Sequence, residues 1–296
     1  MNETVPGRPS KIEMSVVVPA YNAASTLGAQ LEALSGQQWD GEWEVVVADN
    51  GSTDGTAAVA TSFTERDRRF RLIDAGARRG ASFARNLGIA SATGPMIAFC
   101  DADDVVGEGW LAAMGDGLRM APFVTGPQEY QTLNEPWLHG AFGTRTANAL
   151  QMFGGIFPFG PTANLGMRRE LLDHVGGFDE SVSPHEDIEI CLRVWVHGVN
   201  LLFLPEVVVH YRYRATLGGL WRQAVSYGQA TPDIARRLAD YGKPTPSRWL
   251  GARNWLWLAR KLHTLRSPAG RARWIVVAGG AWGRLAGGIR VRRLML

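Results

Sequence analysis

Ser15-Val-Val-Val-Pro19 opens the part of the chain that decides the fold, and Ala20-Tyr-Asn22 follows it as a loop. Two later segments have the same form: Trp43-Glu-Val-Val-Val-Ala48 runs into Asp49, and Gly94-Pro-Met-Ile-Ala-Phe-Cys100 runs into Asp101-Ala-Asp-Asp104. Short apolar runs rich in β-branched residues are typical of parallel strands that are buried on both faces. Their polar ends are expected to meet at one edge of a parallel sheet, which is where ligands bind in such sheets.

Helical segments alternate with these strands. Leu27, Leu31 and Leu34 recur at helical spacing, and residues 70–73 predict one more strand. Further helices are predicted at residues 56–63, 82–92, 168–175 and 188–197, and further strands at residues 201–204 and 207–211. Strand and helix in alternation with short connections predict an α/β fold with a doubly wound, mainly parallel sheet.

Two regions depart from this alternation. Residues 126–161 are rich in Gly, Phe and Pro and fit either an antiparallel insertion or a mobile loop region over the site. Beyond residue 214 the pattern is helical. We therefore predict an N-terminal extension at residues 1–13, a catalytic domain at residues 14–214, and a basic, Trp-rich helical appendage at residues 215–296.

The overall composition is that of an ordinary globular protein. The 296 residues are 46% hydrophobic and 20% charged, which excludes collagen-like, coiled-coil and disordered chains. Cys100 and Cys191 are too few for a disulfide framework, so a reduced, cytoplasmic setting is expected. Residues 1–13 lack the apolar core of a secretory signal. The sequence also contains no run of 18 apolar residues, the length that would predict a membrane-spanning helix.

The charge is distributed unevenly along the chain. Residues 241–296 contain 12 Lys/Arg and no Asp/Glu, whereas the first 240 residues contain 19 basic and 28 acidic residues. Five of the eleven tryptophans fall in the same basic segment. Residues 247–266 predict an amphipathic helix whose apolar face includes Leu250, Trp257 and Leu258. Such a segment fits the interface of an anionic membrane, and the alternative is a helical subdomain packed on the body.

Acidic residues at the strand ends are the first candidates for chemistry. Asp101, Asp103 and Asp104 repel one another unless a cation lies between them, and oxygen-rich sites suit Mg²⁺ or Mn²⁺. A solvated turn that caps a helix is the structural alternative. Asp49 fits either recognition of a base or ribose or an Asx-turn before the next helix. The chain contains neither G-x-G-x-x-G nor G-x-x-x-x-G-K-[ST], which counts against dinucleotide and P-loop sites.

Other candidates lie outside the strand ends. Arg85, within a predicted helix, is placed to bind a diphosphate, although a surface arginine is the commoner case. Glu186 and Asp187 at a helix start fit either a general base or a favourable interaction with the helix dipole. His210, at the end of a predicted strand, fits a metal ligand, although core or surface histidines are more frequent.

Taken together and in order, these segments resemble family 2 glycosyltransferases of the GT-A fold over roughly residues 14–214. The matching motifs are Ser15-Val-Val-Val-Pro-Ala-Tyr-Asn22, Val45-Val-Val-Ala-Asp-Asn-Gly-Ser-Thr-Asp-Gly-Thr56, Ala84-Arg-Asn-Leu-Gly-Ile-Ala-Ser-Ala-Thr-Gly94, Phe99-Cys-Asp-Ala-Asp-Asp104, Gly176-Gly-Phe-Asp-Glu180 and His185-Glu-Asp187. The resemblance implies an inverting, metal-dependent transfer of a sugar from a nucleotide-sugar donor.

The resemblance also implies roles for individual residues. It implies that Asp101 and Asp103 form the D-x-D metal site for Mn²⁺ or Mg²⁺, that Asp187 is the general base with Glu186 as the alternative, and that His210 completes the metal site. Residues implied to bind the donor are Pro19, Ala20, Tyr21, Asp49, Arg85 and Asp101.

Two departures from the family pattern are visible. Asn50 stands where the family's D-D-G-S motif has its second acid, and this replacement keeps the loop geometry but removes a charge. The Q-x-x-R-W motif and the spanning helices of processive synthases are absent, which favours the addition of single sugars.

The predicted function is therefore transfer of one sugar to an acceptor hydroxyl. The acceptor is expected to be a lipid-linked or cell-envelope glycan, or a small molecule. Residues 241–296 are expected to hold the protein on the inner face of the cell membrane, and no motif supports nucleic-acid binding. The alternatives are a non-catalytic sugar-nucleotide-binding or scaffold protein, and a nucleotidyltransferase.

Overall fold

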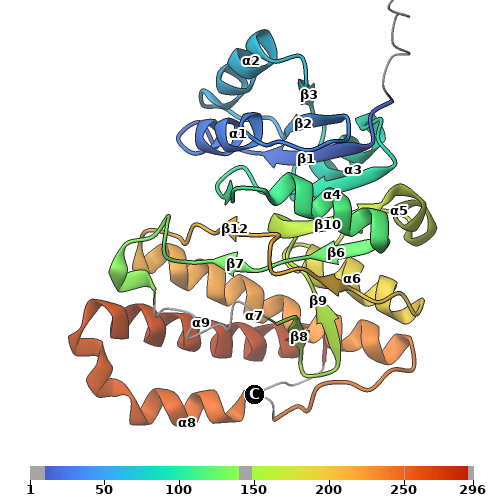
Figure 1. The fold of residues 1–296 in the computed structure, drawn as a ribbon. Helices are drawn as coiled ribbons and strands as arrows, with labels where there is room; N and C mark the ends of the chain where they lie inside the picture. Colours follow the sequence, from blue (N-terminus) through green and yellow to red (C-terminus); the bar gives the residue numbers. More distant parts are fainter. Residues whose placement is uncertain (1–10, 140–148, 250, 293–296) are drawn as a thin grey trace, which may run out of the picture.

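The computed structural model describes residues 11–139, 149–249 and 251–292. Its centre is a seven-stranded sheet with the strand order β11-β6-β10-β4-β1-β2-β3 (Figure 1). In chain order these strands are β1 (Met14–Ala20), β2 (Trp43–Asp49), β3 (Phe70–Asp74), β4 (Met96–Phe99), β6 (Phe123–Thr125), β10 (Leu165–Arg168) and β11 (Leu202–Phe203).

The sheet is mainly parallel. Strands β4, β1, β2 and β3 run parallel to one another, and β11 runs parallel to β6. Strand β10 lies between β4 and β6 and is antiparallel to both. In β1, Ala20 lies opposite Asp49 of β2, so these two strands end at the same level. The expected doubly wound α/β fold is thus confirmed, with one reversed strand at its middle.

The two faces of the sheet are covered by different helices. Met14, Val16 and Val18 of β1 pack with helices on one face, whereas Val17 packs on the other. This alternation follows from the two-residue period of a strand. Helices on the first face are α1 (Leu27–Ser35), α2 (Thr56–Arg66) and α4 (Trp110–Met120), and those on the second are α3 (Ala81–Ser91), α5 (Arg169–Val175) and α6 (Glu186–Val196).

Short strands and single turns build the region beside the sheet edge. The hairpin β8-β9 confirms an antiparallel insertion in part of residues 126–161, whereas β7 of the three-stranded sheet β5-β12-β7 runs parallel to β12. The remainder of this region includes residues 140–148, which lie outside the described residues. The elements are β5 (Val105–Val106), β7 (Gln128–Glu129), η1 (Pro136–Leu138), β8 (Gln151–Phe153), β9 (Phe157–Phe159), η2 (Thr162–Asn164) and β12 (Val209–His210).

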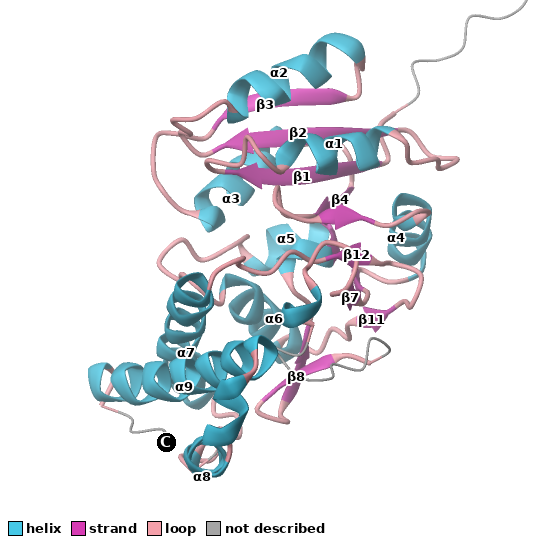
Figure 2. Ribbon diagram, turned by 90° about the vertical axis from the view of Figure 1, so that its left-hand side faces the viewer, coloured by secondary structure: helices cyan, strands magenta, loops and turns pink. Residues whose placement is uncertain are grey.

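The C-terminal region is a helical layer at the end of the molecule opposite β3 (Figures 1 and 2). It consists of α7 (Leu217–Asp240), α8 (Ala252–Arg260), η3 (Leu262–Arg266) and α9 (Pro268–Arg290). Ile234 and Leu238 of α7 belong to the same buried cluster as the strands and α6, so this layer packs on the body. The amphipathic helix expected at residues 247–266 is shorter than predicted, because the last turns form η3, and Leu250 lies outside the described residues.

Helices α7 and α9 approach each other closely through glycine. A Cβ added at Gly283 of α9 would lie 2.2 Å from the carbonyl oxygen of Val225 on α7, and one at Gly287 would lie 2.3 Å from that of Gln229. Both distances are far below van der Waals contact. The spacing of the two helices is therefore set by the absence of side chains at these positions.

Gly283→Ala should lower the free energy of unfolding by about 1–3 kcal/mol, the usual cost of overpacking a tight interface. Gly280→Ala on the same helix is the matched control, since its Cβ would meet only the flexible end of Arg284 at 3.6 Å. That control should be neutral or slightly stabilising, because alanine is the better helix former. Thermal unfolding of both variants checks this, and equal effects of the two would contradict the packing argument.

Candidate functional site

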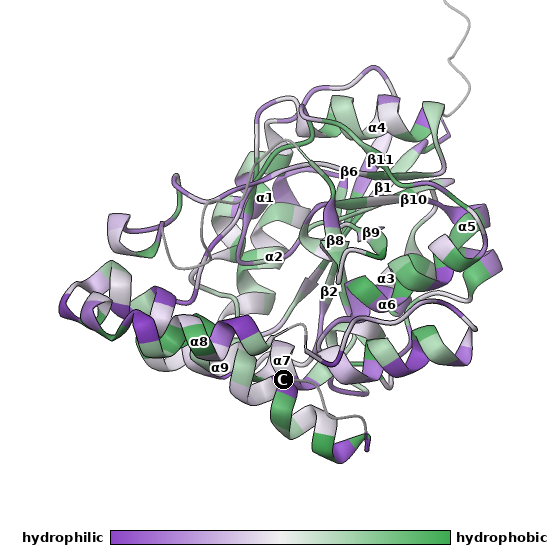
Figure 3. Cartoon of the chain, turned by 90° about the horizontal axis from the view of Figure 1, so that it is seen from below, coloured by the Kyte–Doolittle hydropathy of each residue, from purple (hydrophilic) through white to green (hydrophobic). Residues whose placement is uncertain are grey.

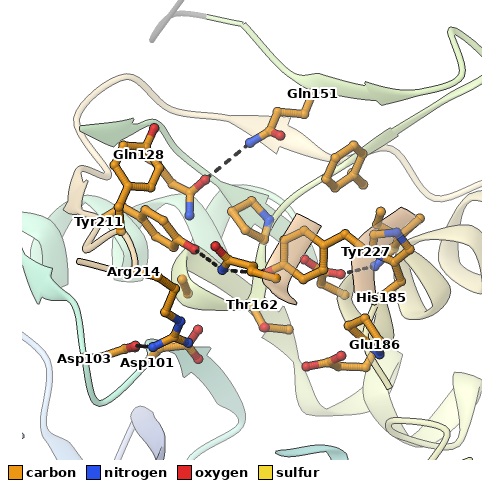
Figure 4. Close-up of a pocket in the computed structure, with 18 of the residues that line it drawn as sticks. Asp101, Asp103, Gln128, Gln151, Thr162, His185, Glu186, Tyr211, Arg214 and Tyr227 are labelled. Carbon is orange, nitrogen blue, oxygen red and sulfur yellow. Dashed lines mark hydrogen bonds and ion pairs between the residues drawn. The ribbon is translucent and has the colours of Figure 1, made fainter. Parts of the chain in front are cut away.

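Two pockets meet at the carboxyl edge of the sheet. The first, here called the sheet-edge pocket, has a volume of about 960 Å³ and is lined by residues at the end of β1, after β1 and before α3, including Pro19, Tyr21 and Arg79. The second, called the tyrosine pocket, has about 250 Å³ and is lined by Tyr130, Tyr211 and other residues (Figure 4). Both pockets share the residues Arg85, Asp101, Asp103, Glu186, Tyr213, Arg214 and Tyr227.

Three carboxylates gather where the two pockets meet. Asp101, Asp103 and Asp104 each offer an oxygen within 4.8 Å of the others. One oxygen of each is already bound: Arg85 donates to Asp101 at 2.7 Å, Arg214 to Asp103 at 3.0 Å, and the Arg212 backbone to Asp104 at 2.8 Å.

The acid cluster meets the chemical requirements of a divalent cation. Asp104 Oδ2 is buried and has no hydrogen-bond partner, and burial together with the charges of Asp103 and Asp101 raises the pKa of Asp104 well above its usual value. Burial also raises the pKa of Asp101, although Arg85 acts in the opposite direction. Carboxylates that are costly to ionise alone are the oxygen donors that Mg²⁺ or Mn²⁺ would bind.

Arg85 connects the acid cluster to the start of α6. Its guanidinium is 3% exposed, and it forms ion pairs with Asp101 at 2.7 Å and Glu186 at 2.9 Å. The alternative of a surface arginine at this position is therefore excluded. Arg85 lies at the wall that the two pockets share, and both of its ion-pair partners are carboxylates, those of Asp101 and Glu186.

The Glu186–Asp187 pair occupies the first turn of α6. The residue before it, His185, has a left-handed backbone with φ of 78°, and burial lowers the pKa of its ring to about 4, so it is neutral at physiological pH. Burial and the neighbouring Glu186 raise the pKa of Asp187 to about 7. The structure thus gives the two acids different environments: Glu186 is paired with Arg85, whereas Asp187 lines only the tyrosine pocket.

His210 lies on β12 and is not one of the three residues of the acid cluster. Its Nδ1 is 2.8 Å from Glu129 Oε2 on the neighbouring strand β7. Although burial acts in the opposite direction, hydrogen bonds from His210, Thr132 and Gln131 lower the pKa of Glu129 to about 2. The structure therefore brings Asp101 and Asp103 together with Asp104 and does not place His210 in that group.

The loop after β2 is held by its own polar side chains. Asp49 Oδ1 accepts hydrogen bonds from the Ser52 backbone at 3.2 Å and from its hydroxyl at 2.5 Å, a turn of the expected Asx kind. The Asn50 amide donates to Ala75 O at 2.6 Å and to Arg78 O at 2.7 Å. A carboxylate could not donate either bond, so the departure at Asn50 has a structural reason.

The last residues of β1 and the residue after it line the sheet-edge pocket. Pro19, Ala20 and Tyr21 all contribute to it. The Tyr21 ring is 52% exposed, and the Arg79 guanidinium lies 4.2 Å from its centroid. An exposed aromatic ring beside a cation is a surface on which a planar base could pack.

Sequence reasoning missed a group of residues that follow β12 and enter α7. Arg212 and Arg214 bind the acid cluster, and Tyr211 and Tyr227 line the tyrosine pocket. The signal was the alternation Tyr211-Arg-Tyr-Arg214, which begins at the last residue of a predicted strand. Alternation alone does not show that this segment returns to the sheet edge.

Comparison with known proteins gives consistent results. The chain matches the family described as "Glycosyl transferase family 2" over residues 15–176 and "Glycosyl transferase family group 2" over residues 96–282. It is 26% identical over 249 residues to a pre-mycofactocin glycosyltransferase of Mycobacterium tuberculosis, covering 81% of this chain and 51% of the relative. It is 27% identical over 201 residues to glycosyltransferase AglE of Haloferax volcanii, covering 66% and 65%.

A solved structure supports the fold. The mannosyltransferase PcManGT from Pyrobaculum calidifontis, in complex with GDP-Man and Mn²⁺, has a TM-score of 0.68 at 20% identity, covering 96% of this chain and 90% of that one. The mainly parallel sheet with its helical C-terminus is that of a GT-A glycosyltransferase. Because the first family description matches more than half of the chain, the chain belongs to glycosyl transferase family 2.

The family assignment confirms the expected enzyme class, a glycosyltransferase, at the level of the family. The chain spans about half to two thirds of the length of these two curated relatives. Among the described residues, no helix combines the length and the apolar character needed to cross a membrane.

Proposed function

We propose that this chain transfers one sugar from a nucleotide-sugar donor to an acceptor hydroxyl, with inversion at the anomeric carbon. The observation that carries the proposal is the arrangement of the acids around the two pockets. Asp101 and Asp103 lie at the wall that both pockets share, and Asp187 lines only the tyrosine pocket. An in-line displacement needs a leaving group on one side of the reacting carbon and a base on the other, and this arrangement supplies both positions.

The sheet-edge pocket is proposed to bind the nucleotide. Pro19, Ala20 and Tyr21 would pack against the nucleoside, and Asp49, at the end of β2, would accept hydrogen bonds from the base. Arg85 would act at the diphosphate end of the donor, between the two acids it bridges. The neighbour with bound GDP-Man supports a nucleotide-sugar as the donor class.

Asp101 and Asp103 are proposed to hold a divalent cation, with Asp104 beside them. A bound Mn²⁺ or Mg²⁺ would offset the charge that develops on the departing diphosphate. The oxygen-only donor set and the Mn²⁺ in the structural neighbour support this assignment.

Asp187 is proposed to be the general base. Its raised pKa makes it a stronger proton acceptor near neutral pH than an ordinary carboxylate. Glu186 is less suited, because its ion pair with Arg85 occupies one of its oxygens.

Asp103→Asn should abolish sugar transfer and weaken donor binding, because the diphosphate loses its counter-charge. The measurement is release of nucleoside diphosphate from a panel of UDP-, GDP- and dTDP-sugars, with and without EDTA. Asp173→Asn, at an exposed position of α5, is the control and should keep its activity. Full activity of Asp103→Asn in EDTA would reject the metal site, and release of pyrophosphate from a nucleoside triphosphate would indicate a nucleotidyltransferase instead. Donor binding without turnover in the parent protein would indicate a sugar-nucleotide-binding protein.

Asp187→Asn should lower turnover by roughly 10²–10⁴-fold, as expected for loss of a general base, with donor affinity nearly unchanged. Since the base must be deprotonated, kcat/KM of the parent should rise with pH through about 7. Glu186→Gln should shift this rise to lower pH, because the charge of Glu186 raises the pKa of Asp187. An inactive Glu186→Gln beside an active Asp187→Asn would reverse the assignment within the pair.

The helical layer is proposed to attach the protein to the inner face of an anionic membrane, near a lipid-linked or cell-envelope acceptor. Trp255, Leu256 and Leu262 are exposed, and the basic residues Arg253, Arg260, Lys261 and Arg266 are exposed around them. Figure 3 shows hydrophilic and hydrophobic residues interspersed along α8. Exposed aromatic rings beside basic groups suit the headgroup region of a membrane.

Arg260→Gln/Lys261→Gln should weaken binding to anionic vesicles by about 2 kcal/mol, roughly 30-fold, since each basic residue near the surface contributes about 1 kcal/mol. Arg66→Gln/Arg68→Gln removes two exposed charges from the far end of the molecule, around α2, and should change little (Figure 1). Co-sedimentation with vesicles containing or lacking anionic lipid, at low and high salt, measures this. Equal loss from both pairs, or no binding by the parent, would leave the layer as a packed subdomain only.

A further inference from the structure

The tyrosine pocket lies on the acceptor side of the proposed reaction. Asp187 lines this pocket and not the sheet-edge pocket. The group that gives up its proton to Asp187 must therefore approach from the tyrosine pocket. This step rests on the proposed function, and it makes the remaining walls of the pocket the surface that meets the acceptor.

Gln223 of α7 orients two phenols at that surface. Its Nε2 donates to the hydroxyl oxygens of Tyr211 and Tyr227, each at 3.3 Å. A carboxamide nitrogen has two protons, so one goes to each phenol. A phenol that accepts this bond keeps its own O–H for another acceptor. Tyr211 and Tyr227 point toward one another across the pocket (Figure 4), and both are thereby set as donors to a bound molecule.

Gln128 of β7 supplies a third donor in the same way. Its Oε1 accepts hydrogen bonds from the Tyr130 hydroxyl at 3.0 Å and from Gln151 Nε2 at 3.5 Å. With its oxygen engaged, the amide is fixed so that its nitrogen points into the pocket (Figure 4). The wall thus presents N–H and O–H groups from three separate elements.

The charge of the pocket restricts what can bind there. Among its described lining residues, the charged ones are Asp101, Asp103, Glu186, Arg85 and Arg214 of the shared wall, together with Asp187, which follows Glu186 in the chain. The other described lining residues are uncharged. They include Tyr130 and Tyr213, whose rings are stacked with centroids 5.3 Å apart and planes within 3°. Flat aromatic rings suit packing against the C–H face of a sugar ring. The four carboxylates outnumber the two arginines, and this excess disfavours binding of an anionic sugar.

We propose that the tyrosine pocket binds an uncharged sugar as the acceptor residue, and that Gln223 is a positioning residue that turns the Tyr211 and Tyr227 hydroxyls toward the hydroxyl oxygens of that sugar. The helical layer therefore contributes directly to acceptor recognition, through the first half of α7.

The first test compares neutral and anionic sugars on the full chain. Binding of the methyl glycosides of glucose, mannose, galactose and N-acetylglucosamine is measured by saturation-transfer NMR titration, beside methyl glucuronide, which adds one carboxylate to the glucose frame. At least one neutral glycoside should bind tenfold or more tightly than the glucuronide. Preference for the glucuronide, or no binding of any neutral glycoside, would overturn the proposal.

The second test uses Gln223→Glu and Gln223→Met, with Gln38→Glu at an exposed position as control. A carboxylate at position 223 can only accept, so it would draw both phenol protons away from the sugar. Gln223→Glu should therefore weaken binding of the neutral glycoside at least tenfold, and Gln223→Met, which leaves the phenol protons free, should weaken it less. UDP and GDP affinities should stay within twofold of the parent.

A merely structural role for Gln223 gives the opposite order, with Met worse than the isosteric Glu, and that order would overturn the proposal. If Gln223→Glu does not fold, as judged by thermal unfolding, Tyr211→Phe replaces it. That variant removes one hydroxyl and should weaken the neutral glycoside alone; an unchanged affinity would count against the proposal. Release of nucleoside diphosphate by the parent protein tests the proposed function separately, so the two can fail independently.

Discussion

The ion pairs of Arg85 hold the site together. Its buried guanidinium, carried by α3, joins Asp101 at the end of β4 to Glu186 at the start of α6, which are 85 positions apart in the sequence. A buried cation must be paired, and removing Arg85 would leave the carboxylates of Asp101 and Glu186 without their shared counter-charge. This requirement fixes the acid cluster relative to the Glu186–Asp187 turn, and it separates the roles of those two acids. Glu186 is ion-paired with Arg85, whereas Asp187 lines the tyrosine pocket and has a raised pKa.

The helical layer forms part of the wall of the tyrosine pocket, through Gln223 and Tyr227 of α7. Because glycines let α9 approach α7 closely, and because Ile234 and Leu238 anchor α7 in the core, Gln223 and Tyr227 have defined positions in the pocket wall. The other exposed surface of the layer carries tryptophan, leucine and arginine on α8. The same layer therefore contributes both to the pocket and to the proposed membrane-facing surface.

Two residues show how a local sequence pattern acquires meaning from its surroundings. Asn50 looks like the loss of an acid, yet its amide donates to two carbonyls of the loop before α3, which a carboxylate could not do. His210 looks like a metal ligand at a strand end, yet its ring pairs with Glu129 on the adjacent strand. Asn50 therefore preserves the loop. The partner of His210, Glu129, lies 81 positions away in the sequence.

The sequence by itself determined the alternation of strands and helices, the mainly parallel sheet and the acidic strand ends, because these follow from periods of two and 3.6 residues and from the order of motifs. It also determined the uneven charge of the chain. Only the tertiary structure decided which acids cluster, that Arg85 is buried between two of them, and that Tyr211, Gln223 and Tyr227 line a pocket with Asp187. The physical reason is that periodicity reports which face of an element is buried, whereas pairing between distant side chains depends on where strand order and helix packing bring them.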